Sequence, residues 1–168
     1  MVNHPFTMRL SVVDTTLLSN FAHANRPDLL QLALGKTAVT TATVLTELRQ
    51  GEAAGLVPRQ AWSWLPQIEL TPAEMALAAG YRNVVDAGEA DCLAVAVTRN
   101  GRFLSDDMAA RRLAQAEGVT VSGTIGVLRH LIEQQHLTLA AADALLARMR
   151  QAGYRAPVGT LQQLLDAK

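Results

Sequence analysis

Short runs of strand-forming residues alternate with helical segments along this 168-residue chain, and this alternation restricts its fold more than any other feature. Strand followed by helix, repeated many times, is typical of a parallel sheet with helices on both faces. The sequence therefore predicts an α/β fold, a three-layer α/β/α sandwich around a central parallel sheet. Its predicted strands, about five, are RLSVV (9–13), TAVT (37–40), QIEL (67–70), RFLS (102–105) and VTVS (119–122).

Helices are predicted between these strands. The side chains of Asp14, Thr15 and Thr16 can cap a helix that starts near Leu17. Further helices are predicted over residues 27–35, 42–50, 58–65, 72–80, 86–98 and 107–117, and the pattern from residue 124 onward is helical with turns at 136–138 and 153–157. We expect a single domain over residues 1–168, with a core of about 8–136 and a helical C-terminal extension of about 137–168.

The composition narrows the class of protein. With 49% hydrophobic and 18% charged residues, the chain is predicted to be a well-packed globular domain. No apolar run is long enough to span a membrane, and residues 1–9 lack the order of a signal peptide, so we expect a cytoplasmic protein. The single cysteine, Cys92, and four scattered histidines form no zinc-site spacing, so any metal would have oxygen ligands.

The overall charge gives no sign of a polyanionic substrate, because fifteen acids balance fifteen bases. If five acids surround bound cations, fifteen bases and ten acids remain elsewhere, a formal charge of +5. The distribution of charge then matters more than its sum. The arginines nearest the acids in sequence would either contact an RNA backbone or form solvated ion pairs, and they are Arg99, Arg102, Arg111 and Arg112.

The segment DAGEADCLAVA (86–96) places acids at the entrance to a buried helix. Six apolar residues begin at Cys92, directly after Glu89 and Asp91. A carboxylate that enters a core is costly unless it has a partner. Glu89 has capping-box spacing from Asp86, and the helix dipole favours Asp91 in the first turn. Neither effect explains why acids precede a wholly apolar run.

Acids also follow two of the predicted strands. Asp14 follows the first strand, and Asp106 and Asp107 follow the strand over 102–105. Because sites in such folds lie beyond the carboxyl ends of the strands, we expect these acids to meet there with Glu47 and Asp91. Carboxylates packed so closely repel one another unless cations neutralise them.

Each acid also has a plainer interpretation, which stays open. Asp14 and Asp106 can serve as helix caps, and Glu47 can be a solvated residue near Arg49. Asp107 can pair with Arg111 at the i, i+4 spacing of a helix. Taken together, these interpretations require all the acids to reach one sheet edge by coincidence, so a functional site is favoured.

The ordered segments VVDTTLLSNF, TVLTELRQG, GEADCLAVA and FLSDDMAARRLA resemble those of the PIN-domain nucleases, which include toxins of VapC type. The segments VSGTIGVLRHLIEQQHLT and LLARMRQAGYRAPVGTLQQLL resemble a branch with a Gly-Glu-Ala motif, a Gly-Thr-x-Gly segment and an added helical tail. The resemblance covers nearly the whole chain. It implies a PIN-like sandwich and a metal-dependent ribonuclease with three or four acids at the sheet edge.

Position by position, the resemblance assigns the acids. Asp14 matches the first acid of the family, Glu47 the second and Asp91 the third. Asp106 and Asp107 match the fourth, and Ser105 stands in place of the Thr of a Thr-x-Asp pattern. Members of this branch often have a small residue where Asp91 stands, which leaves open whether Asp91 or Glu89 faces the metal.

The chemistry of phosphodiester hydrolysis suits such a site, because one or two Mg²⁺ or Mn²⁺ ions activate water and neutralise the phosphoryl oxygens. We expect Asp14, Asp91 and Asp107 to hold the metal, with Asp106 as a further ligand candidate. Glu47 would bind the metal through water or orient the nucleophile, and Thr15 would hydrogen-bond a ligand or the scissile phosphate.

A rival hypothesis is a PIN fold that acts as a binding or regulatory module with weak or no nuclease activity. Other phosphate-processing folds fit poorly, since the chain lacks a phosphate loop and the acid and lysine patterns of phosphatase or receiver domains. The resemblance to VapC-type toxins further implies a small antitoxin partner and a homodimer. The helix expected over residues 137–149 would pack on the core or, in the second interpretation, on such a partner.

Overall fold

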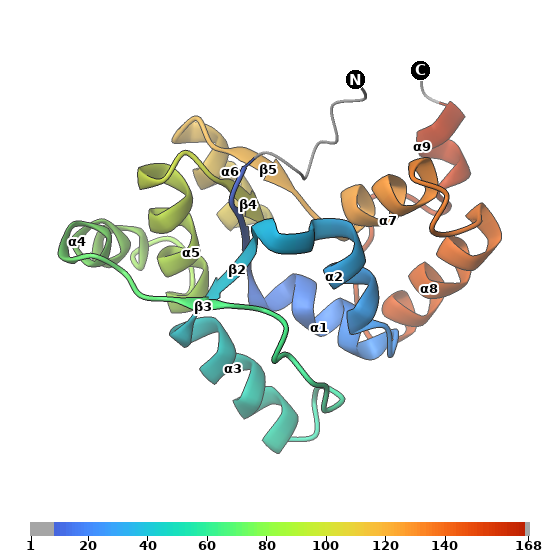
Figure 1. Ribbon diagram of the computed structural model, residues 1–168, viewed down its shortest axis with the longest axis horizontal. Coiled ribbons are helices and arrows are strands. Elements are labelled where there is room, and N and C mark those ends of the chain that lie inside the picture. The colour runs from blue at the N-terminus through green and yellow to red at the C-terminus, as the bar shows by residue number, and fades with distance from the viewer. Residues whose placement is uncertain (1–8, 167–168) are drawn as a thin grey trace.

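A computed structural model describes residues 9–166 and has the α/β architecture that the sequence predicts (Figure 1). These residues form a five-stranded sheet with the order β3-β2-β1-β4-β5, and every pairing in it is parallel. The strands are β1 (Ser11–Val13), β2 (Ala38–Thr41), β3 (Gln67–Ile68), β4 (Arg102–Leu104) and β5 (Thr120–Ser122). The helices are α1 (Thr15–His23), α2 (Pro27–Leu34), the 3-10 turn η1 (Gly35–Thr37), α3 (Ala42–Ala53), α4 (Pro72–Tyr81), α5 (Ala87–Thr98), α6 (Met108–Ala116), α7 (Thr124–Glu133), α8 (Leu139–Gln151) and α9 (Gln162–Asp166).

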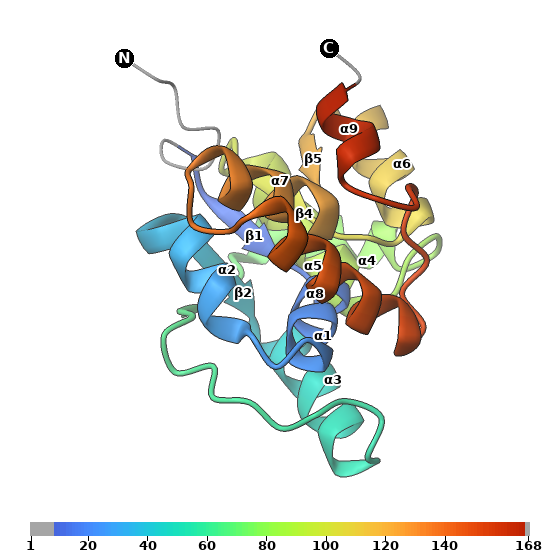
Figure 2. The ribbon, with the colours of Figure 1, turned by 90° about the vertical axis from the view of Figure 1, so that its right-hand side faces the viewer.

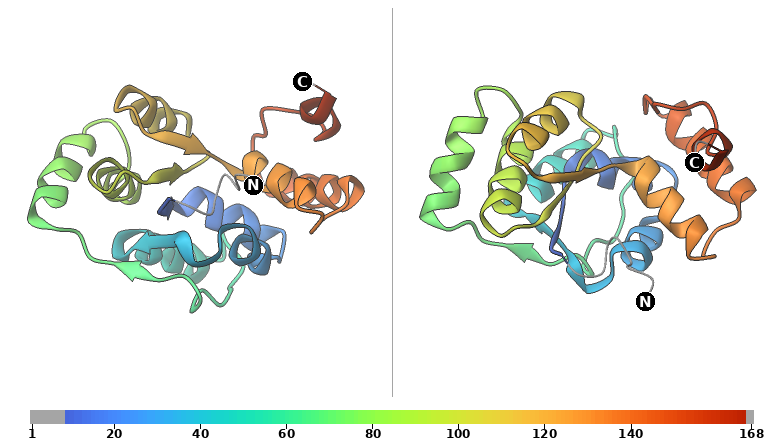
Figure 3. Two further views of the ribbon diagram at one scale, coloured as in Figure 1. Left: turned by 45° about the horizontal axis from the view of Figure 1, so that its top comes forward. Right: turned by 90° about the horizontal axis from the view of Figure 1, so that it is seen from above.

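The helices lie on both faces of the sheet, which makes three layers (Figure 3). Helix α5 packs on β1, β2 and β4, with α4 and α6 beside it. On the other face α1 contacts α2, and α2 contacts α7. Helix α8 crosses the layer formed by α1 and α7 and contacts both (Figure 2). The order of the strands reverses between β1 and β4, so a site is expected at the carboxyl ends of these two strands.

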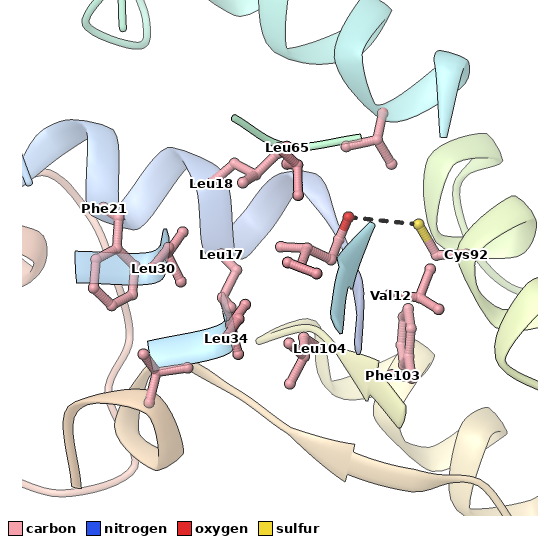
Figure 4. Packing of buried hydrophobic residues seen from close by; sticks show 14 of the residues in the cluster. Val12, Leu17, Leu18, Phe21, Leu30, Leu34, Leu65, Cys92, Phe103 and Leu104 are labelled. Carbon is pink, nitrogen blue, oxygen red and sulfur yellow. Dashed lines mark hydrogen bonds between the residues drawn. The ribbon is translucent and has the colours of Figure 1, made fainter. Parts of the chain in front are cut away.

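The core lies on the two faces of the central strands, because neighbouring strand residues point to opposite faces. Phe103 lies beside Val12 and Cys92 on the α5 face, whereas Leu104 lies with Leu17 on the other face (Figure 4). The Cys92 thiol is fully buried and lies 3.7 Å from the Val13 carbonyl oxygen, to which it donates. Burial raises its pKa well above the usual value, which agrees with the prediction of an inert apolar cysteine.

The prediction of a helix over residues 58–65 was wrong, because these residues form an extended loop. Residues two apart in a helix point about 200° apart around its axis, whereas residues two apart in an extended chain point to the same side. Trp62 and Trp64 both pack their rings on the core from this loop.

Helix α8 packs on the core, as the sequence favoured. Its buried residues Ala142, Leu145, Leu146 and Met149 belong to the main hydrophobic cluster. Within residues 9–166, no helix is both long and apolar enough to cross a membrane.

Candidate active site

Asp14 and Ser105 meet where β1 and β4 end. The backbone N–H of Asp14 donates to the Leu104 carbonyl oxygen at 3.0 Å, which holds the two strand ends side by side. The Asp14 carboxylate is buried, and its Oδ2 accepts hydrogen bonds from Ser105 Oγ at 2.9 Å and from Thr16 Oγ1 at 3.0 Å. Its Oδ1 is buried and has no hydrogen bond of normal geometry from the described residues, although the backbone N–H groups of Thr15 and Thr16 interact with the carboxylate and lower its pKa. Burial raises the pKa of Asp14 from 3.8 to about 6, although the Ser105 hydrogen bond opposes the shift.

Asp14 occupies the N-cap position of α1, as the interpretation of this residue as a helix cap expects, but its side chain makes no capping hydrogen bond of normal geometry. A buried carboxylate oxygen without a donor is a costly arrangement for a structural residue. This oxygen is therefore the strongest indication in the described chain that a ligand belongs at the sheet edge.

Asp14 and Asp107 lie close enough to Glu89 to interact with it electrostatically. Burial is the largest cause that raises the pKa of Glu89 from 4.5 to about 8, and the charges of Asp14 and Asp107 contribute to this rise. Glu89 and Asp107 each use one oxygen at a helix N-terminus: Glu89 Oε2 accepts from Asp86 N at 3.0 Å, and Asp107 Oδ1 accepts from Ala110 N at 2.8 Å.

The capping-box interpretation of Glu89 is thus correct. Asp107, and not Asp106 as the sequence suggested, is the N-cap of α6, and the Arg111 guanidinium bonds the Ser105 carbonyl oxygen in place of the Asp107 carboxylate. Glu89 and Asp107 each keep a second oxygen for a ligand.

Glu47 is held in place by two donors from different elements. Thr15 Oγ1 donates to Glu47 Oε2 at 2.7 Å, and the backbone N–H of Gly88 donates to Oε1 at 2.9 Å. Glu47 is therefore oriented by α1 and by the N-terminus of α5, and it is not a freely solvated residue beside Arg49. Thr15, which was expected to hydrogen-bond a ligand or the scissile phosphate, donates to Glu47 and positions it.

Gly88→Ala is expected to displace Glu47, because a Cβ at this position would lie 2.5 Å from Glu47 Oε2 and 2.9 Å from its Cδ. The Glu47 carboxylate ends a flexible side chain and can move aside, but it would then lose its hydrogen bonds from Thr15 and Gly88, at a cost of about 1–3 kcal/mol that opposes the preference of a helix for Ala over Gly. We expect a lower melting temperature in differential scanning calorimetry than for the control variant. Gly80→Ala in α4 is the matched control, since a Cβ there meets nothing within 4 Å and should stabilise the helix slightly. Equal melting temperatures for the two variants would contradict this role of Gly88.

Asp91 does not join the other acids. Its Oδ1 accepts from Arg82 Nη2 at 2.9 Å and its Oδ2 from Thr43 Oγ1 at 2.6 Å, so both oxygens have partners. These residues line a separate hollow of about 480 Å³ beside β3. Of the two alternatives for the third acid, the geometry favours Glu89.

Asp106 is held by four hydrogen bonds, which fill the capacity of a carboxylate. Its donors are Asn20 Nδ2, the Thr124 backbone N–H, Thr124 Oγ1 and the Tyr154 hydroxyl. They come from α1, α7 and the segment after α8, so Asp106 ties three parts of the chain to the end of β4. This role favours Asp107 over Asp106 as a metal ligand.

The glycines of the two motifs have a common physical reason, which is close approach to a side-chain oxygen. Gly88 makes room for the Glu47 carboxylate, and a Cβ on Gly123 would lie 2.5 Å from Asp106 Oδ1. A Cβ on Gly126 would collide with the Ser122 hydroxyl oxygen. Thr16, Thr124 and Tyr154 were not predicted as site residues, although all three lie within the quoted segments.

Of the arginines near the acids in sequence, two are engaged away from the site. Arg99 pairs with Glu74 at 2.8 Å, and Arg102 is buried in β4. Arg111 Nη1 donates to the Ser105 carbonyl oxygen at 2.8 Å, which places it beside the sheet edge. Arg112 is exposed and lines a hollow together with Asp107.

The side-chain atoms at the sheet edge that could bind a metal are all carboxylate or hydroxyl oxygens. Oxygen ligands of this kind suit a hard divalent cation. Within residues 9–166, no group of three Asp, Glu, His or Cys side chains has the geometry to hold one metal ion in this conformation. The unpartnered Asp14 Oδ1, with Glu89 and Asp107 in its field, nevertheless fits a cation better than any alternative, since a positive charge would remove the mutual repulsion.

A family model described as a PIN domain, DUF3368, matches residues 10–167. The chain belongs to the PIN-domain family. Its parallel sheet between two helical layers is the PIN-like sandwich that the sequence predicted. PIN domains are in general nucleases, so the acids at the edge of β1 and β4 lie in a nuclease-type fold. No curated protein and no solved structure matches the chain significantly.

Proposed function

We propose that this PIN domain is a metal-dependent endoribonuclease. The observation that carries the proposal is the buried Asp14 carboxylate, whose Oδ1 has no hydrogen bond of normal geometry from the described residues and whose neighbours include the acids Glu89 and Asp107. A binding module without activity would gain nothing from keeping such an arrangement, which destabilises the fold.

In this proposal Asp14, Glu89 and Asp107 would hold Mg²⁺ or Mn²⁺. The bound metal lowers the pKa of a water molecule and neutralises charge on the phosphoryl oxygens. Ser105 and Thr16 fix the Asp14 carboxylate through Oδ2, which keeps Oδ1 directed away from them. Asp91 and Asp106 would have structural roles, because their oxygens already have partners.

Glu47 is proposed as the residue that orients the attacking water. Thr15 and Gly88 each bond one of its oxygens, so its position is fixed before a substrate arrives. A carboxylate held in this way can accept a hydrogen bond from water and take up its proton, provided that the water lies within hydrogen-bond reach.

The test of the proposal is cleavage of a labelled single-stranded RNA by the full chain, with Mg²⁺, with Mn²⁺ and with EDTA. We expect cleavage that requires either metal and stops in EDTA. Absence of cleavage in all three conditions, together with no stabilisation of the fold by metal, would support the rival hypothesis of a binding or regulatory module.

The stability of the metal-free protein is expected to fall as the pH rises from about 4 to 8. Asp14 and Glu89 have raised pKa values in the folded state, about 6 and about 8, whereas the unfolded chain loses these protons near 3.8 and 4.5. The unfolded state therefore binds fewer protons over this range, and stability decreases with pH. Melting temperatures measured in EDTA at several pH values would show this decline.

Mg²⁺ is expected to reverse that decline, because it binds the deprotonated carboxylates. At a concentration of about 100 times Kd it adds about 2.7 kcal/mol, or roughly 5–10 °C in melting temperature for a chain of this size. The increase should be larger at pH 8 than at pH 5.5. An equal shift at both pH values, or a flat profile in EDTA, would contradict the assignment of Asp14 and Glu89 to one site.

The choice of RNA over DNA, the number of metal ions and the cytoplasmic location stay predictions. So do the toxin role, the small antitoxin and the homodimer, which rest on the resemblance to VapC-type proteins. An antitoxin that inserted a basic group among Asp14, Glu89 and Asp107 would compete with the metal. Co-purification with the product of a neighbouring small reading frame would test that partner.

A further inference from the structure

The segment that follows α8 lies against the acidic sheet edge. The Tyr154 hydroxyl donates to Asp106 Oδ1 at 3.2 Å, and this bond fastens residues 152–157 beside the end of β4. Burial and the nearby charge of Asp106 raise the pKa of Tyr154, so the hydroxyl keeps its proton and remains a donor. The C-terminal extension therefore contributes directly to the surroundings of Asp107.

Two hollows flank this segment. One, of about 440 Å³, is bordered by α1 and includes Thr16 and His23; the other, of about 760 Å³, is bordered by α6 and the start of α7. Asp106, Asp107, Tyr154 and Arg155 line both of them. The two hollows thus meet at Asp106 and Asp107, and Asp107 connects them to the proposed metal site.

The larger hollow carries cations without anionic partners. Arg112 and Arg155 are exposed, and neither has an ion pair or hydrogen bond among the described residues. Other arginines are paired with acids, for example Arg82 with Asp91 and Arg99 with Glu74. Arg111 lines the same hollow and keeps its guanidinium at the Ser105 carbonyl oxygen. Guanidinium groups with free donors are well suited to phosphate oxygens.

The floor of the larger hollow is partly apolar. Val121, Ile125 and Pro157 line it beside the arginines. Arginine side chains beside apolar surface suit a single strand of nucleic acid. The arginines can bind its phosphates, and the apolar surface can contact the faces of its sugars and bases. A folded peptide or a small anion would use only one of these two features.

We infer that the larger hollow binds the backbone phosphates of single-stranded RNA on one side of the cleaved bond, through Arg112 and Arg155. The segment 152–157 forms the wall that guides the strand past Asp107. This inference rests on the proposed function, since it assigns the path of the substrate to the same site. It also gives the helical C-terminal extension a role in substrate binding.

The test is fluorescence anisotropy with a short labelled single-stranded RNA in EDTA, so that binding is measured without cleavage. The variants are Arg112→Gln, Arg155→Gln and the double variant, with Arg59→Gln as control because Arg59 is exposed on the loop after α3. We expect each single change to weaken binding about 3-fold and the double change about 10-fold. The slope of log affinity against log salt should fall by about 0.7 per arginine removed.

Cleavage kinetics in Mg²⁺ distinguish a role of Arg112 and Arg155 in RNA binding from a role in stabilising the fold. The double variant should raise KM by a factor similar to its loss of affinity and leave kcat and the melting temperature near those of Arg59→Gln. If the double variant binds RNA as Arg59→Gln does, with the wild-type salt slope, the inference is overturned while metal-dependent cleavage by the wild type still supports the nuclease. If the wild type neither binds nor cleaves RNA, the proposed function fails, and the inference fails with it.

Discussion

Asp14→Asn is expected to abolish RNA cleavage, with a loss on the order of 1,000-fold, because it removes the buried charge on which a metal would bind. Asn has nearly the same shape and its side-chain oxygen can still accept from Ser105 and Thr16. The fold should therefore persist, and stability in EDTA at neutral pH should equal or exceed that of the wild type. Initial rates of cleavage in Mg²⁺, measured beside melting curves, would check both expectations.

Asp28→Asn is the matched control for this variant. Asp28 is exposed and pairs with Arg26 on the surface at 2.8 Å, so its loss removes one carboxylate without touching the sheet edge. We expect wild-type cleavage and a normal Mg²⁺-induced rise in melting temperature. The assignment of Asp14 fails if Asp14→Asn and Asp28→Asn cleave RNA at similar rates.

Glu89→Gln and Asp91→Asn are expected to have opposite consequences, although the two residues lie in the same turn of α5. Glu89→Gln should reduce cleavage about 1,000-fold and remove most of the stabilisation by Mg²⁺. Its fold should survive, because Gln at this position of a capping box can accept from Asp86 N as Glu does. The electrostatic interaction of Glu89 with Asp14 and Asp107 is the reason for this expectation.

Asp91→Asn should keep cleavage close to the wild-type rate and lose stability instead. It removes the charge that pairs with Arg82, whose side chain is half-exposed, so the cost is about 1 kcal/mol. That corresponds to roughly 2–4 °C in melting temperature for a chain of this length. An inactive Asp91→Asn with an active Glu89→Gln would reverse the assignment and restore Asp91 as the third acid.

The sequence predicted the sheet because every predicted strand is short, contains β-branched or other apolar residues and is followed by a predicted helix, and these local signals agree with the tertiary structure. The loop at residues 58–65 is the exception. Its apolar residues have helical spacing, but the core receives both Trp62 and Trp64, which lie two residues apart and would point in nearly opposite directions from a helix. The surface that these two rings cover belongs to the rest of the fold and is not encoded in the eight residues themselves.

The sequence alone also could not decide whether Glu89 or Asp91 is the third acid of the site. With 3.6 residues per turn, the two side chains point about 200° apart around the axis of α5. Amphipathic patterning usually tells which side of a helix faces the core, but α5 is buried all round from residue 88 to 96. The sequence therefore placed both acids at the start of the helix, and only the packing of α5 against β1 distinguishes them.

The most direct test of the metal assignment is a crystal structure of the protein soaked in Mn²⁺, with anomalous difference maps. We predict a peak at about 2 Å from Asp14 Oδ1, with oxygens of Glu89 and Asp107 completing its protein ligands. Asp91 should remain bonded to Arg82 and Thr43. A peak in the hollow beside Asp91, or no peak at the sheet edge at saturating Mn²⁺, would contradict the account.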